Sequence, residues 1–264
     1  MTNYALELTA GELARYRMMA EQARTGEAAT WEAAGIVPGA RVADVGCGPG
    51  AVLLAVADVV GAAGSVIGVD ADPVAVATAS ELIKQAGLSN ASAQIGKATD
   101  TGLEPGSFDV VLMRHVLAHN GPDEARIVQH LATLVRPGGC VFLVDVDAPA
   151  GRVLGADSDA MDLAERYIEF HRARGNDLQV GLRLGQLLQS AGLEVLSHQG
   201  VYSILSAPPG MRPPAWAARD AMVAEGHATA ADLARWEAAL LRTDAAADRP
   251  TLFFPLFSAI GRRR

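Results

Sequence analysis

A buried strand that runs directly into a glycine-rich loop is the feature that most constrains this chain. Residues 42–51 are VADVGCGPGA, in which an apolar run meets an acid and then three glycines within five residues. Glycine adopts positive φ and lets a ligand approach the backbone closely. A helix that begins just after such a loop points free N–H groups at it. The segment therefore predicts a ligand-binding turn at the C-terminal end of a strand in an open parallel sheet.

Strand and helix patterns alternate along the following residues. Apolar strands are expected at 41–46, 64–70, 91–96, 108–113, 140–147, 194–205 and 250–263. Helices are expected at 9–34, 51–61, 72–88 and 122–139 (the last including a turn), over most of 157–191, and as one or two helices within 214–243. This order predicts an α/β fold whose parallel sheet is covered on both faces. Pro255 in the last strand indicates an irregularity or an edge position.

Composition and charge exclude several classes of protein. The chain has 264 residues, half of them hydrophobic, which is enough for one large domain or a domain with an added cap. Its formal net charge of −8 repels a phosphate backbone, so nucleic acid is not an expected partner. The two cysteines, Cys47 and Cys140, lack metal-ligand spacing and are expected to stay reduced. We find no signal-peptide core and no apolar run of membrane-spanning length, and we expect a cytoplasmic protein without membrane contact.

An acid at the end of the second strand indicates the class of ligand. Asp70 lies 24 residues after Gly46, and a carboxylate there can accept hydrogen bonds from both hydroxyls of a ribose. Together with the glycine loop it predicts an adenosine-containing ligand. The pattern Gly46-x-Gly48-x-x-Ala51 also fits the dinucleotide-binding motif, so NAD is one alternative, and a glycine turn without a ligand is another.

Four further features resemble a known family when they are taken together. Asp44 precedes the loop, Phe108-Asp109 opens the fourth strand, a Pro-Gly-Gly turn at 137–139 precedes the fifth strand, and the chain ends in an apolar strand. The combination is similar to the class I S-adenosylmethionine-dependent methyltransferases, in particular the small-molecule branch with a UbiE/UbiG-like domain. The likeness is dense over residues 36–147 and looser beyond them.

The resemblance implies a Rossmann-like sheet of seven strands in the order 3-2-1-4-5-7-6, with the last strand antiparallel and with helical cap elements. It also implies a division of the chain into three parts. These are an N-terminal helical lid at 1–35, a methyltransferase core at 36–207 and 249–264, and a helical cap insertion at 208–248.

The same resemblance implies S-adenosylmethionine as cofactor and identifies residues that hold it. These are Tyr16, Asp44, Gly46, Gly48, Gly50, Asp70, Ala71, Lys97, Ala98, Met113 and Arg114. Asp70 matches the ribose-binding acid of the family. Lys97 stands where the family has an acid for the adenine amino group, and because an ammonium cannot accept that hydrogen bond, Asp100 is a candidate substitute. Tyr16 is either a lid contact or a core residue of its helix.

Methyl transfer is an in-line displacement that depends mostly on alignment, with a base needed only where the acceptor must lose a proton. The catalytic candidates are His115, His119 and Asp145. The two histidines are four residues apart, so one helical face could hold both. The spacing also suits a metal, but no Glu follows the first His as in H-E-x-x-H and no acid cluster accompanies it, so we expect no metal site.

Methionines and aromatic residues outside the core predict an apolar or aromatic small molecule as methyl acceptor, as in the tailoring of bacterial natural products in secondary metabolism. Tyr167 and His171 either line its pocket or pack a helix face. Two other functions stay open: a protein that binds the cofactor without methylating, such as a cyclase, and an NAD-linked oxidoreductase. A homodimer is carried as a hypothesis, and the sequence does not name the acceptor atom.

Overall fold

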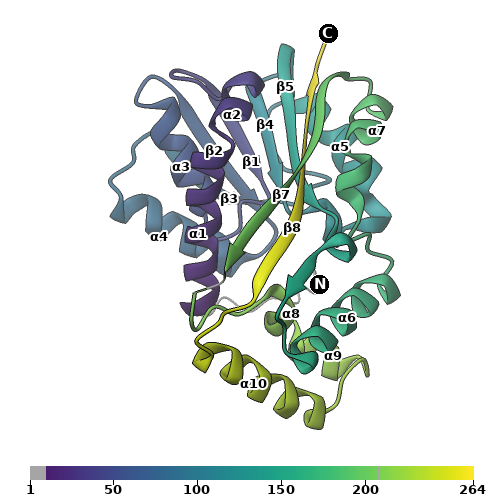
Figure 1. Ribbon diagram of the computed structural model, residues 1–264. Coiled ribbons are helices and arrows are strands. Elements are labelled where there is room, and N and C mark those ends of the chain that lie inside the picture. Colours follow the sequence, from purple (N-terminus) through teal and green to yellow (C-terminus); the bar gives the residue numbers. More distant parts are fainter. Residues whose placement is uncertain (1–9, 207) are drawn as a thin grey trace.

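The computed structural model describes residues 10–206 and 208–264, with side chains from residue 15 onward (Figure 1). In chain order the elements are α1 (Ala10–Gly26), α2 (Ala28–Ala34), β1 (Arg41–Val45), α3 (Ala51–Val60), β2 (Ser65–Asp70), α4 (Pro73–Gln85), β3 (Ala91–Ile95), β4 (Phe108–Arg114), α5 (Glu124–Leu134), β5 (Val135–Val146), β6 (Arg152–Leu154), α6 (Ser158–Ala173), α7 (Leu184–Ser190), β7 (Glu194–Ser206), α8 (Pro214–Ala217), α9 (Arg219–Ala224), α10 (Ala230–Ala245) and β8 (Thr251–Arg262). Short 3-10 helices are η1 (Leu117–His119), η2 (Gly121–Asp123), η3 (Ala148–Ala150) and η4 (Val180–Arg183).

The strands form one sheet with the expected α/β topology. Its order is β3-β2-β1-β4-β5-β8, and β7 pairs with the other edge of β8. The first five strands are parallel, whereas β8 is antiparallel to both β5 and β7. β8 and β7 therefore occupy the places expected for the seventh and sixth strands, and the short β6 is an addition that continues along the same edge of β8 as β5. The predicted fold class is confirmed.

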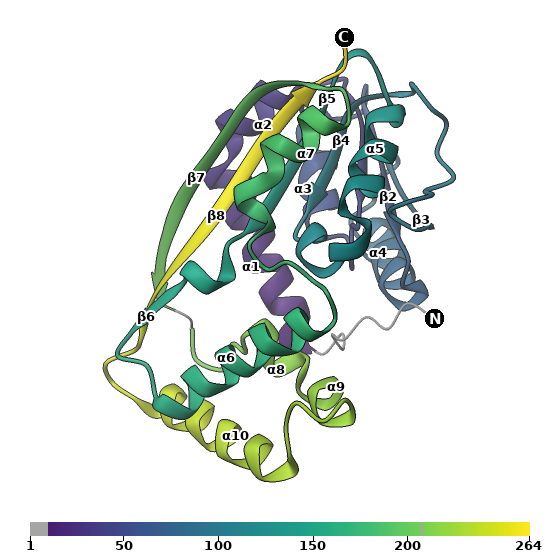
Figure 2. The same cartoon turned by 90° about the vertical axis from the view of Figure 1, so that its right-hand side faces the viewer.

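Helices cover both faces of the sheet. Successive residues of one strand point to opposite faces, so each strand packs against helices on both sides. In β4, Leu112 packs in the buried cluster that includes Leu53 of α3. The next residue, Met113, packs in the cluster that includes Leu131 of α5. Figure 2 shows α5 and α7 in front of the sheet with α3 behind it.

The N-terminal helical segment bends where a single helix was expected over 9–34. Residue 9 lies outside the described residues. α1 ends at Gly26, Glu27 has non-helical φ and ψ of −113° and 9°, and α2 begins at Ala28. Ala23 of α1 is fully buried in the cluster that α3 shares, so the helix is fixed along that face of the sheet.

One expectation about the C-terminal third is wrong in detail, and another is narrowed to one of its alternatives. Residues 214–243 contain three helices rather than one or two, because the chain turns after Ala217 and again after Ala224. β8 is an interior strand, as the expected strand order has it, so of the two alternatives for Pro255 the irregularity holds and the edge does not. Pro255 is tolerated there because it lies between Leu256, which pairs with β5, and Phe253, which pairs with β6, where that edge has no partner strand.

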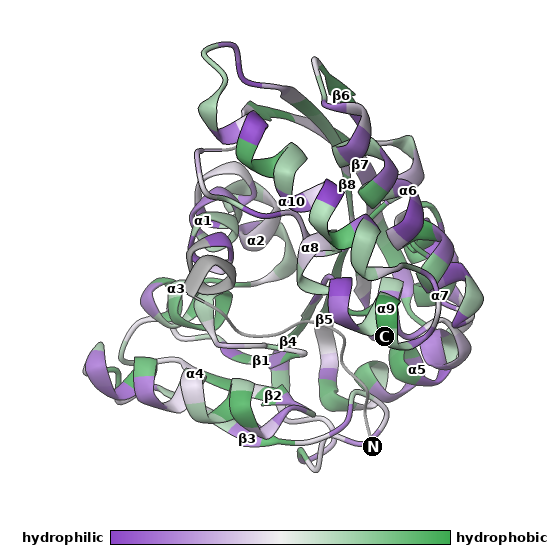
Figure 3. Cartoon of the chain, turned by 90° about the horizontal axis from the view of Figure 1, so that it is seen from below, coloured by the Kyte–Doolittle hydropathy of each residue, from purple (hydrophilic) through white to green (hydrophobic). Residues whose placement is uncertain are grey.

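The C-terminal ends of the parallel strands face a layer of helices formed by α6, α8, α9 and α10. Figure 3 looks onto this end of the sheet, with α8 and α9 in front of the strands and α1 at one side. Ligands of open α/β sheets bind at this end of the strands, so the loops that follow the parallel strands are where the site is built.

Candidate cofactor and acceptor site

The loop after β1 is a tight turn that lies against the end of β2. The backbone N–H groups of Gly46 and Cys47 donate to the carbonyl oxygen of Val69 at 2.7 and 3.1 Å. Gly46, Gly48 and Gly50 have φ of 80°, 53° and 82°, the left-handed region that favours glycine. A Cβ on Gly46 would lie 2.2 Å from Cγ2 of Val116, so the loop after β4 closes directly over this turn.

Asp70 connects the glycine loop to the end of β2. Its Oδ2 accepts a hydrogen bond from the Gly48 N–H at 2.8 Å, and its Oδ1 accepts one from the Asp72 N–H at 2.9 Å. Burial raises the pKa of this carboxyl above its usual range, against the effect of these two hydrogen bonds. A carboxylate has about four acceptor positions, so both oxygens keep capacity for ribose hydroxyls.

Asp44 is a second acid beside the loop, and it is almost completely buried, with 2% of its surface exposed. Its Oδ2 has no hydrogen-bond partner among the described residues. Burial, reinforced by the negative charge of Asp70, raises the pKa of Asp44 to about 7, while the positive charge of Arg114 opposes the shift. A buried carboxylate oxygen without a partner beside a second carboxylate fits a ligand that brings a positive charge, as the sulfonium and ammonium of S-adenosylmethionine do.

The lid helix α1 brings two adjacent residues to this site. A Cβ on Gly48 would lie 3.8 Å from the Tyr16 ring, so Tyr16 covers the glycine loop. Arg15 is 8% exposed, and its charge lowers the pKa of both His115 and His119. Tyr16 was anticipated from the sequence, whereas Arg15 was not, because a single arginine on an amphipathic helix carries no distinguishing pattern.

Arg114 at the end of β4 joins the sheet to the bend between α1 and α2. Its Nη1 contacts both carboxylate oxygens of Glu27 at 2.6 and 2.7 Å. The two side chains are only 9% and 14% exposed. Met113, also predicted beside the cofactor, is 1% exposed and packs in the core cluster on the α5 face.

The adenine end of the site is formed by the residues that follow β2 and β3. Ala71 and Ala98 are partly buried, and Ala98 packs against the core cluster. Lys97 and Asp100 are exposed and pair through their backbones in a tight turn at 2.9 and 3.1 Å. Asp100 stays the candidate for the adenine amino group, because its carboxylate can accept a hydrogen bond and the Lys97 ammonium cannot.

The loop after β4 departs from the expected helical face. His115 has φ of 56°, the one left-handed residue other than glycine in the part of the chain the structure describes, and only residues 117–119 form a 3-10 turn. His115 and His119 therefore do not lie one helical turn apart, and that prediction is wrong. Burial and neighbouring positive charges, with Arg114 first, hold the pKa of His115 well below its usual range. For His119, burial and the charge of Arg15 lower the pKa to about 4.

Asp145 at the end of β5 anchors this loop. Its Oδ2 accepts from the Ala118 N–H at 3.1 Å and its Oδ1 from the Val146 N–H at 2.9 Å. Burial raises the pKa of Asp145 to about 7 despite these backbone hydrogen bonds. With both oxygens engaged by the backbone, Asp145 is suited to holding the His119 loop in place.

A third histidine, from α6, meets His119 across the site. The ring centroids of His119 and His171 are 4.7 Å apart, and the Tyr167 ring lies 4.4 Å from His171. The sequence allowed Tyr167 and His171 either a pocket-lining or a packing role. Nothing in the sequence marked Asn176, which lies 2.9 Å from His171 and also contacts the Gly121 N–H, 55 residues away in the chain.

Among residues 10–206 and 208–264, no group of three or more His, Cys, Asp or Glu side chains is placed to hold a metal ion. Over the same residues, no helix combines the length and apolar character needed to cross a membrane.

Comparison with known proteins identifies the family. A family described as a methyltransferase domain matches residues 36–179, more than half of the chain. The chain therefore belongs to the methyltransferase-domain family and is a class I S-adenosylmethionine-dependent methyltransferase, with S-adenosylmethionine as its cofactor.

Two curated relatives are O-methyltransferases. The chain is 41% identical over 107 residues to nocamycin O-methyltransferase of Saccharothrix syringae, a match that covers 40% of this chain and 38% of that protein. It is 40% identical over 104 residues to the ubiquinone biosynthesis O-methyltransferase of Ralstonia nicotianae, which covers 39% of this chain and 42% of the relative. The matches thus span about two fifths of the lengths of these relatives.

Solved structures share the fold at low sequence identity. The YcgJ protein of Bacillus subtilis superposes with a TM-score of 0.58 at 20% identity, over 90% of this chain and 97% of that chain. The [4+2]-cyclase SpnF superposes with a TM-score of 0.57 at 20% identity, over 92% and 82% of the two chains.

Proposed function

We propose that this protein transfers the methyl group of S-adenosylmethionine to an oxygen atom of an apolar or aromatic small molecule, in the tailoring of bacterial natural products. Both curated relatives described above are named as O-methyltransferases, and one is named for the natural product nocamycin. When bound, the cofactor supplies an electrophilic methyl carbon on a sulfonium whose leaving group is neutral.

Asp44 is the observation that carries the choice of ligand. A buried carboxylate with an unpaired oxygen beside Asp70 would repel the diphosphate of NAD and attract a cationic group. We propose that Gly46, Gly48 and Gly50 hold the methionine portion of the cofactor. Asp70 would hold the ribose, and α1 would cover the cofactor through Tyr16.

We propose His119 as the proton acceptor for the methyl acceptor's hydroxyl. With its pKa lowered to about 4 it is neutral at pH 7, so its ring has a free nitrogen to receive a proton. Such a base contributes about 10²–10⁴-fold, while alignment of the reacting groups contributes roughly 7–11 kcal/mol. Asp145 would act through the loop it anchors, and His115 would shape the turn that leads to His119.

We also propose the division into a lid at 1–35, a core at 36–207 and 249–264, and a cap insertion at 208–248. The described helices of the two outer segments lie beside and below the C-terminal end of the sheet (Figure 3). A small-molecule acceptor between cap and core would be shielded from water, and the acidic net charge again disfavours nucleic acid.

A turnover assay tests the proposal. The protein is incubated with S-adenosylmethionine and a panel of phenols, enols and carboxylic acids, and S-adenosylhomocysteine is measured. We expect S-adenosylhomocysteine to form with at least one of these acceptors. We expect the rate of turnover to fall by about 100-fold or more in His119→Ala. Tight cofactor binding without product would favour the second candidate, a non-methylating role. The fold that this chain shares with a [4+2]-cyclase is the reason for naming a non-methylating role as the second candidate.

A further inference from the structure

Asn176, in the loop that follows α6, links the helical layer to the loop that carries His119. Its Oδ1 accepts a hydrogen bond from the Gly121 N–H at 3.3 Å, and its Nδ2 lies 2.9 Å from Nδ1 of His171. A Cβ on Gly121 would lie 2.0 Å from the Gly175 carbonyl oxygen, so the two loops are in close contact. Because the Gly121 N–H occupies Oδ1, the NH₂ end of the Asn176 amide is the end that faces the His171 ring.

The hydrogen bonds of Asn176 determine where the proton of His171 resides. Because Oδ1 is occupied by a backbone donor, the group that faces Nδ1 of His171 is the amide NH₂, which can only donate. Nδ1 must therefore accept, and in the neutral ring the proton is on Nε2.

The Nε2–H of His171 is a donor without an acceptor. The residue is 4% exposed, and Nε2 has no hydrogen-bond partner among the described residues. Leaving a buried donor unsatisfied is costly, so such a group needs an explanation, and an acceptor atom on a bound molecule supplies one. The ring of His119, the proposed proton acceptor, lies beside it.

The charges around this donor favour a negative partner. Burial, His119 and Arg174 lower the pKa of His171 to about 3, so the ring is neutral at pH 7. Arg15 supplies a positive charge close to His119. The groups beside His171 are the neutral His119 ring, the Tyr167 and Phe170 rings and the Arg174 cation. Arg174 is itself paired with Glu225 at 2.7 Å, and no acid is among the groups that shift the pKa of His171.

We propose that Asn176 holds His171 as the Nε2–H tautomer, and that this N–H donates a hydrogen bond to the reacting oxygen of the methyl acceptor. The inference rests on the proposed O-methyl transfer and narrows the acceptor to an acidic enol or carboxylic acid. When an enol is the acceptor, its O–H bond breaks, the proton passes to the His119 ring, and the oxygen keeps the electron pair. A carboxylic acid binds already ionised and has no proton to lose, so for it His171 alone contacts the reacting oxygen. His119 is a weak base and accepts a proton only from an acidic group, so the two histidines select for the same class of acceptor.

Nitrogen NMR of the ¹⁵N-histidine-labelled full chain tests the tautomer without any catalytic turnover. We expect His171 as neutral Nε2–H from pH 8 to pH 5. In Asn176→Asp the carboxylate can only accept, so the proton moves to Nδ1. His198, whose Nε2 lies 2.9 Å from the Gly181 carbonyl oxygen, is an internal reference that stays unchanged. A wild-type Nδ1–H tautomer, or the same tautomer in both proteins, overturns the proposal.

Benzoate and benzyl alcohol, one carrying a carboxylate and the other a neutral hydroxyl, test the donor itself on protein saturated with S-adenosylhomocysteine. We expect benzoate to shift the Nε2–H signal of His171 saturably and benzyl alcohol to leave it in place. Asn176→Asp and His171→Phe should bind benzoate at least fivefold more weakly, whereas His171→Gln, which keeps an N–H donor, should retain most of the affinity. Benzoate binding that is equal in His171→Phe overturns the proposal. Failure of methyl transfer with every acceptor, with these results intact, would instead refute only the proposed function.

Discussion

The carboxylate of Asp70, at the end of β2, accepts a hydrogen bond from the backbone N–H of Gly48 at 2.8 Å, across 22 residues of chain. The contact joins the two features that the sequence alone marked as ligand-binding. It fixes the glycine loop before any ligand arrives, and a pre-formed loop lowers the ordering cost of binding.

We expect Gly46→Ala to destabilise the protein more than Gly39→Ala. Both glycines have positive φ, 80° and 88°, so both alanines carry roughly 1–2 kcal/mol of backbone strain. At Gly39 a Cβ meets nothing within 4 Å, whereas at Gly46 it meets the Val116 side chain at 2.2 Å, adding about 1–3 kcal/mol of overpacking. Urea denaturation measures the difference, and equal losses would show that the loop after β4 does not close over this turn.

We expect Asp44 to make cofactor binding depend on pH. With its pKa raised to about 7, Asp44 is largely protonated at lower pH in the free protein, so affinity for S-adenosylmethionine should fall by up to about tenfold per pH unit below 7. Calorimetry from pH 5.5 to 8.5 should show this slope in the wild type and not in Asp44→Asn. Parallel profiles for the two proteins would contradict the role of Asp44.

The stability of the free protein should change in the opposite direction with pH. A carboxyl whose folded-state pKa is raised contributes stability that is fully present below its unfolded pKa and is lost as pH rises through about 7. Asp44→Asn should therefore be more stable than the wild type at pH 8.5, with the difference disappearing toward pH 4. Urea denaturation at pH 4 and pH 8.5 measures the difference in the free energy of unfolding between the two proteins. A difference that is the same at both pH values would contradict the raised pKa of Asp44.

The sequence determines most of the fold because its strands are continuous apolar runs separated by glycine. It also places Asp70 near the glycine loop, since both follow neighbouring parallel strands. It does not reveal how Pro255 fits inside the sheet, because its tolerance depends on a gap between β5 and β6. The left-handed φ of His115 is equally hidden, since positive φ is uncommon for any single residue other than glycine, even though histidine adopts it more often than most.

The contacts around the acceptor side of the site could not be predicted for a related reason. Asn176 meets Gly121 across 55 residues, and Arg114 meets Glu27 across 87. Neither pair has periodicity or motif spacing, so only the assembled sheet brings them together. Spacing in the sequence predicted the cofactor loop but not the histidine pair of His119 and His171.

We expect Glu27→Gln to destabilise the protein by about 3 kcal/mol. The change leaves the buried Arg114 guanidinium without its carboxylate, and breaking one side of a buried pair is costly. The double variant Glu27→Gln/Arg114→Gln should recover much of the loss, because no uncompensated charge remains. A double variant as unstable as the sum of the single ones would show that the pair is not coupled.

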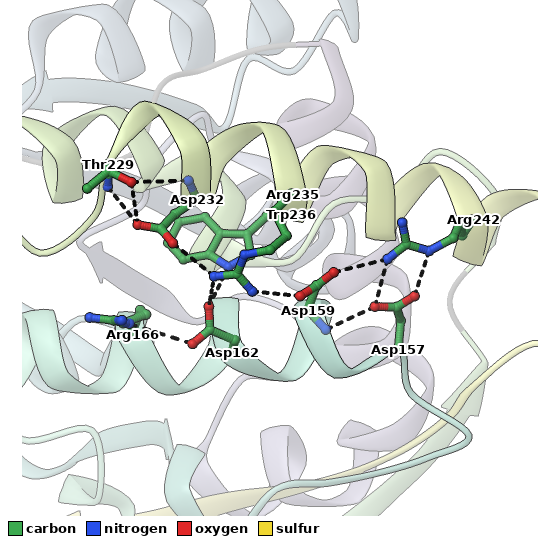
Figure 4. A network of polar contacts seen from close by, with 9 residues as sticks. All are labelled: Asp157, Asp159, Asp162, Arg166, Thr229, Asp232, Arg235, Trp236 and Arg242. Atoms are coloured by element: carbon green, nitrogen blue, oxygen red, sulfur yellow. Dashed lines mark hydrogen bonds and ion pairs between the residues drawn. The ribbon is translucent and has the colours of Figure 1, made fainter.

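The helical layer should depend more on packing than on ion pairs. Figure 4 shows Arg235 of α10 among carboxylates that include Asp159 and Asp162 of α6, with Trp236 donating to Asp162 at 2.8 Å. Trp236 is fully buried, so Trp236→Ala should cost about 3–5 kcal/mol. Arg235→Ala, at a partly exposed side chain, should cost less, and its effect should shrink as salt is added. A larger, salt-independent loss at Arg235 would contradict this ranking.

Calorimetric titration of S-adenosylmethionine into the wild type, Asp70→Ala and Asp58→Ala tests most directly whether the glycine loop and Asp70 hold the adenosyl group. Asp58 is an exposed acid on α3 and serves as the control. We expect Asp58→Ala to bind like the wild type and Asp70→Ala to bind at least tenfold more weakly, a loss of about 1.4 kcal/mol or more. Equal affinity in Asp70→Ala, or a wild-type protein that binds NAD and not S-adenosylmethionine, would contradict it.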